Sequence, residues 1–553
     1  MKINEIENPD FLQNLSYAEL TELAGEIRTF LIENVSKTGG HFSSNLGMVE
    51  TTIALHYVFN QKNDKIIFDV GHQGYTHKIL TGRAKDFTTL RKKNGLSGFL
   101  KYKESIYDVW EAGHSSTSIS AAAGFLEAKA TGTDIGNVVV LIGDGSIQNG
   151  LAFSALNYLG DKKNQKAIII LNDNNMSISR NVGFLSNILD RVRIRKPYQF
   201  LRKLTPKFLR NFKRAISSYL HGGNMLASMG FRFFGPIDGH DIKTLIKYFT
   251  YAKNSEQSII IHVKTTKGKG YEFAEADDLG AWHGTAAFDI ATGKPLTETP
   301  EGQISWSKGI GDLLLTEAKK NSDIIVLSPA MIHGSGLSNF QKELPDQIID
   351  VGIAEEHCIV MASALALTGK IPVVSIYSTF LQRAYDEINH DITRTNAHVI
   401  FLVDRAGIVG PDGSTHQGTF DLAFLSHLPN IVITMPKDLN EAAALLHYAL
   451  YQHQGPFVIR YPRADISVLE VASSVPFGTW EIIRPLADIN FICYGPAVSA
   501  FQDAIGSRNF GLINARYLKP LDINILRQIG KRKLVVYEEV QRLGGLGALI
   551  MDA

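Results

Sequence analysis

Two short polar stretches could together bind a metal ion and a diphosphate. The first is Gly143-Asp144-Gly145, and the second, about 30 residues later, is Asn172-Asp173-Asn174-Asn175-Met176. Mg²⁺ prefers about six oxygen ligands and commonly keeps phosphate oxygens among them. We therefore predict that the Asp144 carboxylate, the Asn174 amide oxygen and the Met176 carbonyl bind Mg²⁺. Because a lone Gly-Asp-Gly is more often a tight turn, the prediction depends on the pairing of the two stretches.

The apolar runs before these stretches predict the elements that position them. Residues 138–142 and 167–171 are short, β-branched runs that end at polar residues, which is typical of buried parallel strands. Ligands of open α/β sheets bind at the carboxyl ends of the strands. Both polar stretches should therefore lie at one edge of a sheet. Ser146, just after the first stretch, either contacts a diphosphate or caps the next helix.

Strand and helix patterns alternate along most of the 553 residues. This alternation predicts an α/β fold of doubly wound, mainly parallel sheets. The length suggests roughly three domains. We place the first domain at residues 1–273, a linker rich in Asp, Gly, Thr and Pro at 274–305, the second domain at 306–476 and a third at 477–553.

Composition excludes several classes of protein. The net charge of +1 argues against nucleic acid or an anionic membrane as the main partner. Two cysteines cannot form a disulfide framework, and the N-terminus lacks the features of a signal peptide, so we expect a cytoplasmic protein. Between Arg191 and Arg214, ten of 24 residues are Lys or Arg. That segment either binds nucleic acid or is an exposed insertion near a site for phosphorylated substrates, and the overall charge favours the insertion.

Further motifs follow one another along the chain. They are His41-Phe-Ser-Ser-Asn-Leu-Gly, Asp69-Val-Gly-His-Gln, Gly113-His-Ser-Ser-Thr-Ser, Gly235-Pro-Ile-Asp-Gly-His-Asp, Val351-Gly-Ile-Ala-Glu-Glu-His, Tyr377-Ser-Thr-Phe-Leu-Gln-Arg-Ala-Tyr-Asp, Asp404-Arg-Ala-Gly-Ile-Val-Gly-Pro-Asp-Gly-Ser-Thr-His-Gln-Gly and Arg460-Tyr-Pro-Arg. Each motif alone could arise by chance, but their order is highly specific. Taken in order from His41 to Gly547, they resemble the motifs of the 1-deoxy-D-xylulose 5-phosphate synthase family of transketolase-like thiamine diphosphate enzymes.

The resemblance implies a three-domain, transketolase-like homodimer that uses thiamine diphosphate and Mg²⁺. The first domain would bind the diphosphate and the second the pyrimidine, with each active site between these two domains of one chain. The implied reaction condenses pyruvate with D-glyceraldehyde 3-phosphate, with loss of CO₂, to give 1-deoxy-D-xylulose 5-phosphate for isoprenoid, thiamine and pyridoxal biosynthesis.

Glu355 is the residue that this chemistry most needs. In the family, the matching carboxylate bonds to the aminopyrimidine and promotes the tautomer that activates the cofactor. Here Glu355 stands between a predicted strand, residues 348–351, and a helical run, where burial could raise its pKa. A glutamate at a helix start is otherwise most often there for the helix dipole.

The resemblance also assigns histidines and cofactor contacts. It implies that His41, His283 and His416 face the reacting centre, while His72 and His114 lie nearer the diphosphate and thiazolium, although these roles are interchangeable on the sequence alone. A lone histidine is otherwise usually a surface or satisfied core residue. Further implied cofactor contacts are Gly113, Ser115, Gly145, Ser146, Asn174, Lys267 and Phe380, the last packing on the aminopyrimidine.

Substrate contacts follow from the same motifs. Permanently charged, planar guanidinium groups suit a phosphorylated aldehyde, and Arg405 and Arg463 match the family's phosphate-binding arginines. Tyr377, Arg383 and Asp412 match neighbouring substrate contacts.

Two other functions stay open on the sequence. One is another thiamine diphosphate enzyme, such as a transketolase or a 2-oxoacid dehydrogenase component, and the other is an inactive cofactor-binding paralogue. Members of the family usually continue beyond the Gly-rich turn at 544–547, so we expect an incomplete third domain. That would affect folding and dimerisation more than the site, whose motifs lie upstream.

Overall fold

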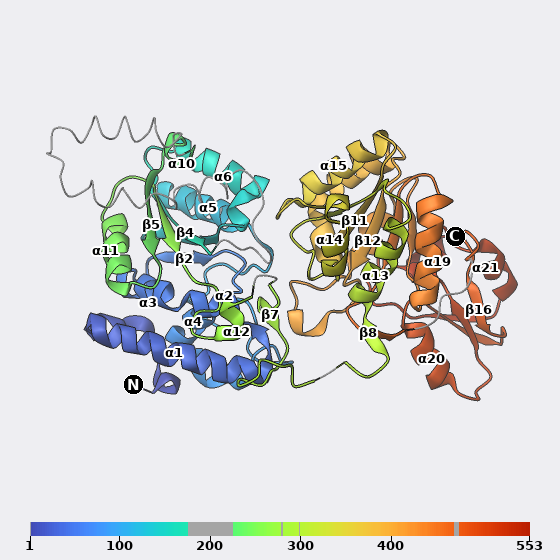
Figure 1. The fold of residues 1–553 in the computed structure, drawn as a ribbon, viewed down its shortest axis with the longest axis horizontal. Helices are drawn as coiled ribbons and strands as arrows, with labels where there is room; N and C mark the ends of the chain where they lie inside the picture. Colours follow the sequence, from blue (N-terminus) through green and yellow to red (C-terminus); the bar gives the residue numbers. More distant parts are fainter. Residues whose placement is uncertain (1, 175–224, 278–279, 298, 469–474) are drawn as a thin grey trace. The chain divides into compact units, whose positions relative to one another are not determined.

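The computed structural model describes residues 2–174, 225–277, 280–297, 299–468 and 475–553, apart from the side chain of Asp412. The chain divides into two compact units, Met1–Thr297 and Glu298–Ala553 (Figure 1). Met176 and the basic segment Arg191–Arg214 lie outside the described residues.

The first unit is built on a sheet of five parallel strands in the order β2-β3-β4-β6-β5. Its central strands are almost wholly apolar and fully buried, as expected for a parallel sheet covered on both faces. The strands are β2 (Lys65–Phe68), β3 (Val138–Gly143), β4 (Ala167–Asp173), β5 (Arg232–Asp238) and β6 (Ile259–Lys264).

Helices cover both faces of this sheet because successive strand side chains point to opposite sides. In β3, for example, Val139 and Leu141 belong to one apolar core, whereas Val138, Val140 and Ile142 belong to another. Figure 1 shows α1 (Tyr17–Thr38), α3 (Val49–Val58) and α11 (Ile242–Lys253) on the first side and α5 (Ser118–Ala130) and α6 (Gly150–Asp161) on the second.

Capping side chains fix where several of these helices begin. Ser16 forms a capping box with Glu19 at the start of α1, and Asp241 accepts the Thr244 N–H at the start of α11. The shorter elements of the unit are β1 (Gly40–His41), α2 (Ser43–Gly47), α4 (Tyr75–Lys78), α10 (Met225–Ser228), α12 (Glu272–Glu275) and β7 (Gly284–Thr285).

The second unit contains a seven-stranded sheet in the order β10-β9-β11-β12-β14-β13-β19. All neighbours are parallel except β13 and β19, which are antiparallel. The strands are β9 (Ile324–Ser328), β10 (Ile348–Asp350), β11 (Ile371–Tyr377), β12 (Ile400–Asp404), β13 (Val432–Thr434), β14 (Phe457–Arg460) and β19 (Tyr517–Lys519).

A four-stranded sheet in the order β16-β18-β17-β20 completes the second unit, with β16 antiparallel to its neighbour. The strand β19 leaves this region and joins the larger sheet, so the last segment of the chain is part of the core around β13. The smaller sheet comprises β16 (Glu481–Arg484), β17 (Ile489–Cys493), β18 (Gly511–Asn514) and β20 (Lys533–Val536), and β8 (Gln303–Ser305) pairs separately with β15 (Asp465–Ser467).

Helices surround both sheets of the second unit. α15 packs on β9 and β11, and α13 packs on α19. The helices are α13 (Trp306–Ala318), α14 (Ser338–Glu343), α15 (Glu355–Leu367), α16 (Ser378–Leu381), α17 (Tyr385–Glu387), α18 (Asp421–Ser426), α19 (Leu439–Tyr451), α20 (Ala497–Ile505), α21 (Ile523–Ile529) and α22 (Leu546–Asp552).

These mainly parallel sheets with flanking helices confirm the predicted α/β fold. No described helix is both long and apolar enough to span a membrane.

Candidate active site

The two polar stretches of the first unit lie side by side at the carboxyl edge of its sheet. Asp144 directly follows β3, and Asn174 directly follows β4. The backbone N–H of Asp144 donates to the Asn172 carbonyl at 3.0 Å, and the Gly145 N–H donates to Asp144 Oδ1 at 3.1 Å. The structure therefore places the predicted ligands Asp144 and Asn174 on adjacent strand ends, while the third predicted ligand, Met176, lies outside the described residues.

Lys267 adds a buried positive charge near this edge. It lies three residues beyond the end of β6, and its side chain is almost completely buried. Burial lowers the pKa of Lys267 to about 8, although the charges of Asp277 and Asp144 act in the opposite direction. A buried ammonium group at this edge of the sheet suits a site that receives an anion.

Asp69, at the end of β2, holds the loop that carries the next predicted contacts. Its Oδ1 accepts the Ser116 N–H at 2.9 Å, and its Oδ2 accepts the Ser118 hydroxyl at 2.7 Å and the Ser118 N–H at 3.2 Å. The Ser116 hydroxyl in turn donates to the Ser146 carbonyl at 2.8 Å. Asp69 and Ser116 thus tie the loop before α5 to the Gly143–Ser146 turn, and Gly113, His114 and Ser115 directly precede Ser116 in that loop.

Three of the predicted histidines form a cluster of rings in the first unit. The ring centroids of His41 and His72 are 5.5 Å apart, those of His72 and His283 5.1 Å, and those of His41 and His283 6.0 Å. Pairing between β1 and β7 brings His41 and His283 together, although they are far apart in sequence. Burial and the charges of Lys267 and His72 lower the pKa of His283 well below its ordinary value, so its imidazole is neutral at pH 7.

Asn45 fixes the backbone around two of these histidines. Its amide nitrogen donates to the carbonyls of His41 and His72, and its Oδ1 accepts the Tyr75 N–H, all at 2.8 Å. The Tyr75 hydroxyl accepts the His41 N–H at 3.1 Å. The ring cluster therefore rests on a buried set of directed hydrogen bonds.

In the second unit, Glu355 is the first residue of α15 and is buried. Burial raises the pKa of Glu355, and the Arg383 guanidinium opposes that change at 3.4 Å from its Oε2. The predicted position of Glu355 between a strand and a helix is confirmed, since β10 ends at Asp350. A buried carboxyl group with a raised pKa is suited to share a proton with a nitrogen base.

A row of aromatic side chains lies near the end of β11. The rings of Tyr377 and Phe380 are stacked at 5.4 Å with an interplanar angle of 9°, and Phe380 meets the His416 ring edge to face at 5.6 Å. The Arg405 guanidinium lies 3.7 Å from the centroid of the Tyr377 ring. The structure thus brings together Tyr377, Phe380, Arg405 and His416.

Arg405 is held in place by its neighbours after β12. Its Nη1 donates to Asp404 Oδ2 at 2.9 Å and to the Gly334 carbonyl at 3.2 Å. Asp404 is completely buried and also accepts the Ser307 hydroxyl at 2.8 Å. The other predicted phosphate ligand, Arg463, follows β14 and is exposed.

Sequence reasoning missed four residues that organise these groups. Asn45, Asp69, Tyr75 and Asp404 make the supporting bonds described above, yet the sequence assigned them no role. Asn45, Asp69 and Asp404 belong to the motifs that identified the family, so their positions inside the motifs were the available signal. Tyr75 lies just outside such a motif and gave none.

Sequence models of two families match the chain. The model described as 1-deoxy-D-xylulose-5-phosphate synthase matches residues 3–265, and the transketolase pyrimidine-binding domain matches residues 302–467. Among solved structures, transketolase from Leishmania mexicana is 17% identical, covers 95% of this chain and 91% of its own, and gives a TM-score of 0.40.

Curated relatives match along the whole chain. The 1-deoxy-D-xylulose-5-phosphate synthase of Macrococcus caseolyticus is 45% identical over 575 residues, a match that covers 100% of this chain and 91% of the relative. The protein of the same name from Geobacillus sp. strain WCH70 is 44% identical over 580 residues, again with 100% and 91% coverage. These matches show that the chain belongs to the 1-deoxy-D-xylulose-5-phosphate synthase family.

Proposed function

We propose that this protein condenses pyruvate with D-glyceraldehyde 3-phosphate, releasing CO₂ and forming 1-deoxy-D-xylulose 5-phosphate. Beside the family membership, the observation that carries this proposal is the buried carboxyl group of Glu355 at the start of α15, with its raised pKa. It lies within the region that matches a pyrimidine-binding domain, where a nitrogen base would need such a partner.

The described residues fit thiamine diphosphate and Mg²⁺. Asp144 and Asn174 offer the oxygen ligands that Mg²⁺ prefers, and the buried Lys267 ammonium group suits a diphosphate. Glu355 would bond to the aminopyrimidine, and Phe380 offers a ring face for stacking. Once bound, the cofactor supplies the nucleophilic carbon and the electron sink of the reaction.

The histidine cluster would assist proton transfer to and from the substrate oxygens. His283 is neutral at pH 7, so its imidazole offers one N–H donor and one acceptor nitrogen to a substrate oxygen. The rings of His41 and His72 contact the His283 ring, so a substrate oxygen bound at one of these rings would lie close to the other two. We assign His416 to the same task in the second unit, beside Phe380.

Arginine side chains would bind the phosphate of the aldehyde. The Arg405 guanidinium is fixed by Asp404 and stacked on Tyr377. Because the side chain is already held in place, it loses little conformational entropy when it binds a phosphate. Arg463 is exposed and can reach a ligand from solvent. Arg383, paired with Glu355, and Asp412 complete the proposed substrate contacts.

Four finer assignments are also proposals. They are Mg²⁺ as the metal, a homodimer as the assembly, the cytoplasm as the location, and the division of the chain into domains. The proposed domains are residues 1–273, 306–476 and 477–553, with residues 274–305 as the linker between the first two. Two buried free cysteines, Cys358 and Cys493, support a reducing compartment. Light scattering of the purified protein tests the dimer.

Substrate omission tests the proposed reaction. With thiamine diphosphate and Mg²⁺ present, mass spectrometry should detect deoxyxylulose phosphate only when pyruvate and glyceraldehyde 3-phosphate are both supplied. Turnover of a ketose phosphate donor without pyruvate would instead indicate a transketolase. Thermal stabilisation by the cofactor and metal without any product would indicate an inactive cofactor-binding paralogue.

A further inference from the structure

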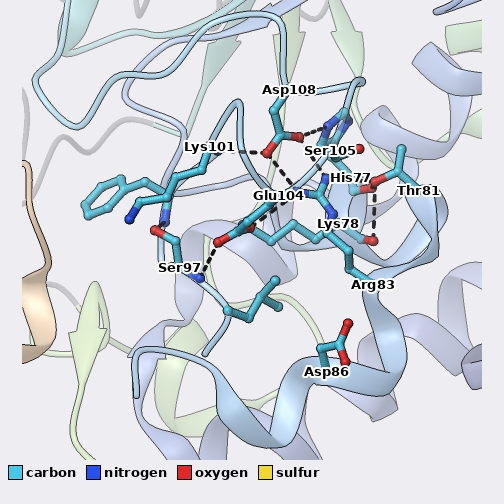
Figure 2. Close-up of polar contacts among 12 residues, drawn as sticks. His77, Lys78, Thr81, Arg83, Asp86, Ser97, Lys101, Glu104, Ser105 and Asp108 are labelled. Carbon is cyan, nitrogen blue, oxygen red and sulfur yellow. Dashed lines mark hydrogen bonds and ion pairs between the residues drawn. The ribbon is translucent and has the colours of Figure 1, made fainter. Parts of the chain in front are cut away.

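A group of ionisable side chains, buried except for the half-buried Glu104, lies in the first unit outside the residues assigned above (Figure 2). This buried ionic cluster consists of His77, Lys78, Arg83, Glu104 and Asp108. Asp108 accepts a hydrogen bond from His77 Nε2 at 2.9 Å and two from Arg83, at 2.7 and 2.8 Å. Glu104 forms an ion pair with Lys78 and lies 3.5 Å from Arg83.

The cluster is balanced in charge. Burial alone would raise the pKa of Asp108, but hydrogen bonds from His77 and Arg83 hold it well below its usual range. Burial lowers the pKa of His77, so the ring is neutral, and burial lowers the pKa of Lys78 to about 8. The two carboxyl side chains, Glu104 and Asp108, thus match in number the two basic side chains that they pair with, Lys78 and Arg83.

Two separate segments of the chain are tied together by this cluster. The cations and His77 belong to α4 and the turn after it, whereas the two carboxylates belong to a loop about 25 residues later. Those carboxylates also bind backbone of their own loop: Glu104 Oε1 accepts the Ser97 N–H at 2.7 Å, and Asp108 Oδ2 accepts the Lys101 N–H at 2.8 Å. These bonds anchor the loop on both sides of Phe99, which lies midway between their donors.

Both tied segments touch His41. From the loop, the Phe99 ring meets the His41 ring edge to face at 4.9 Å. From α4, the Tyr75 hydroxyl accepts the His41 N–H at 3.1 Å and lies 3.5 Å from its Nδ1. His41 is therefore contacted by one group from each of the two segments that the cluster ties together.

We propose that Asp108 and Glu104 are positioning residues for His41, acting through Phe99 and Tyr75. Within the described residues, their hydrogen bonds and ion pairs go to His77, Lys78, Arg83 and the backbone of their own loop, and to none of the residues proposed for cofactor or substrate. By tying the Phe99 loop to α4, they hold the His41 ring at a fixed angle to the rings of His72 and His283. The inference rests on the proposed function of His41 in proton transfer.

A double-mutant cycle separates positioning from general support of the fold. Asp108→Asn keeps the shape of the side chain but turns an amide N–H group towards donors such as Arg83 and the Lys101 N–H. It should lower kcat about 10- to 100-fold, with KM for pyruvate little changed. In a His41→Ala background, the same substitution should change kcat by less than about twofold, because the group it positions is gone. An equal loss in both backgrounds would overturn the proposal.

The matched control is Asp64→Asn. Asp64 is also buried and accepts backbone N–H groups, from Asn137 at 2.6 Å and Asn60 at 2.9 Å, but it precedes β2 at the opposite edge of the sheet. This variant should lose thermal stability and keep kcat. Should Asp108→Asn fail to fold, the cycle is run with Glu104→Gln, whose side chain is 18% exposed and better tolerates the change.

Hydrogen–deuterium exchange of the cofactor-free protein supplies a readout that needs no activity. Asp108→Asn should accelerate exchange in peptides covering both residues 97–101 and 40–45, whereas Asp64→Asn should leave both unchanged. Faster exchange in the loop alone would overturn the proposal. If the wild type makes no product, the proposed function fails, while this exchange experiment still tests the link between cluster and His41.

Discussion

Among single residues, Glu355 is the one on which the proposed reaction depends most. Its carboxyl group is buried at the start of α15, with Arg383 as its charged neighbour. Glu355→Ala should lower kcat at least about 100-fold, because the aminopyrimidine would lose the proton partner that we propose for it. The affinity for thiamine diphosphate and Mg²⁺, measured by calorimetry, should stay within a few-fold, since the substitution leaves the residues proposed to bind the diphosphate unchanged.

Glu356→Gln is the matched control for that experiment. Glu356 is the neighbouring carboxylate in the first turn of α15 and is less buried than Glu355. This variant should keep near-normal turnover. Near-normal turnover of Glu355→Ala itself would contradict the assigned role.

Lys267 predicts how cofactor affinity depends on pH. Burial lowers the pKa of Lys267 to about 8 in the cofactor-free protein, against the opposing charges of Asp277 and Asp144. The ammonium group therefore loses its proton as the pH rises through 8. A diphosphate binds the protonated form more tightly, so affinity should be highest below pH 8 and fall by up to about tenfold per pH unit above it. Titrations at pH 7, 8 and 9 measure this slope.

Lys267→Arg provides the control, because an arginine keeps its charge throughout this range. Its affinity for thiamine diphosphate should be nearly independent of pH. An equal slope in wild type and variant would assign the pH dependence to another group.

At the scale of elements, Asp69 joins the end of β2 to the loop before α5. It accepts three hydrogen bonds from Ser116 and Ser118, and Ser116 reaches the Ser146 carbonyl. Asp69→Asn should weaken thiamine diphosphate binding about tenfold, because an amide presents an N–H group to these donors and releases the loop. Calorimetry checks the affinity, and an unchanged value would mean that the loop does not contribute to cofactor binding.

A buried ion pair in the second unit predicts a loss of stability. Arg460, at the end of β14, donates to Asp421, at the start of α18, at 2.6 and 2.9 Å, and both side chains are buried. Asp421→Asn should lower the free energy of unfolding by about 3–5 kcal/mol, because a buried guanidinium group loses its partner. Denaturant unfolding measures this loss, and a change below about 1 kcal/mol would contradict it.

Strands and strand ends were predictable because their signals are local. The runs that became β3 and β4 are β-branched and end at polar residues, so the sequence alone places Asp144 and Asn174 at one edge of the sheet. The partners of Asp69 lie 47 and 49 residues away. An aspartate after a strand has many possible uses, and nothing local selects those partners.

At the scale of the whole molecule, pairing between strands that are distant in sequence places residues that local sequence patterns do not. The pairing of Gly40 with Thr285 and of His41 with Gly284 brings His283 to the histidine cluster from a stretch predicted to be a linker. Likewise, β19 leaves the last segment and joins the larger sheet beside β13. Such contacts depend on tertiary packing, so local sequence patterns do not reveal them.

The family membership and the roles proposed for Glu355 and Asp144 all lead to one reaction, whose stoichiometry can be measured directly. Purified protein with thiamine diphosphate and Mg²⁺ is given pyruvate labelled with ¹³C at its carboxyl carbon, together with D-glyceraldehyde 3-phosphate. We expect one labelled CO₂ for each molecule of 1-deoxy-D-xylulose 5-phosphate formed, with both lost in Glu355→Ala. Absence of the product from the wild type, or its formation without labelled CO₂, would rule out the proposed reaction.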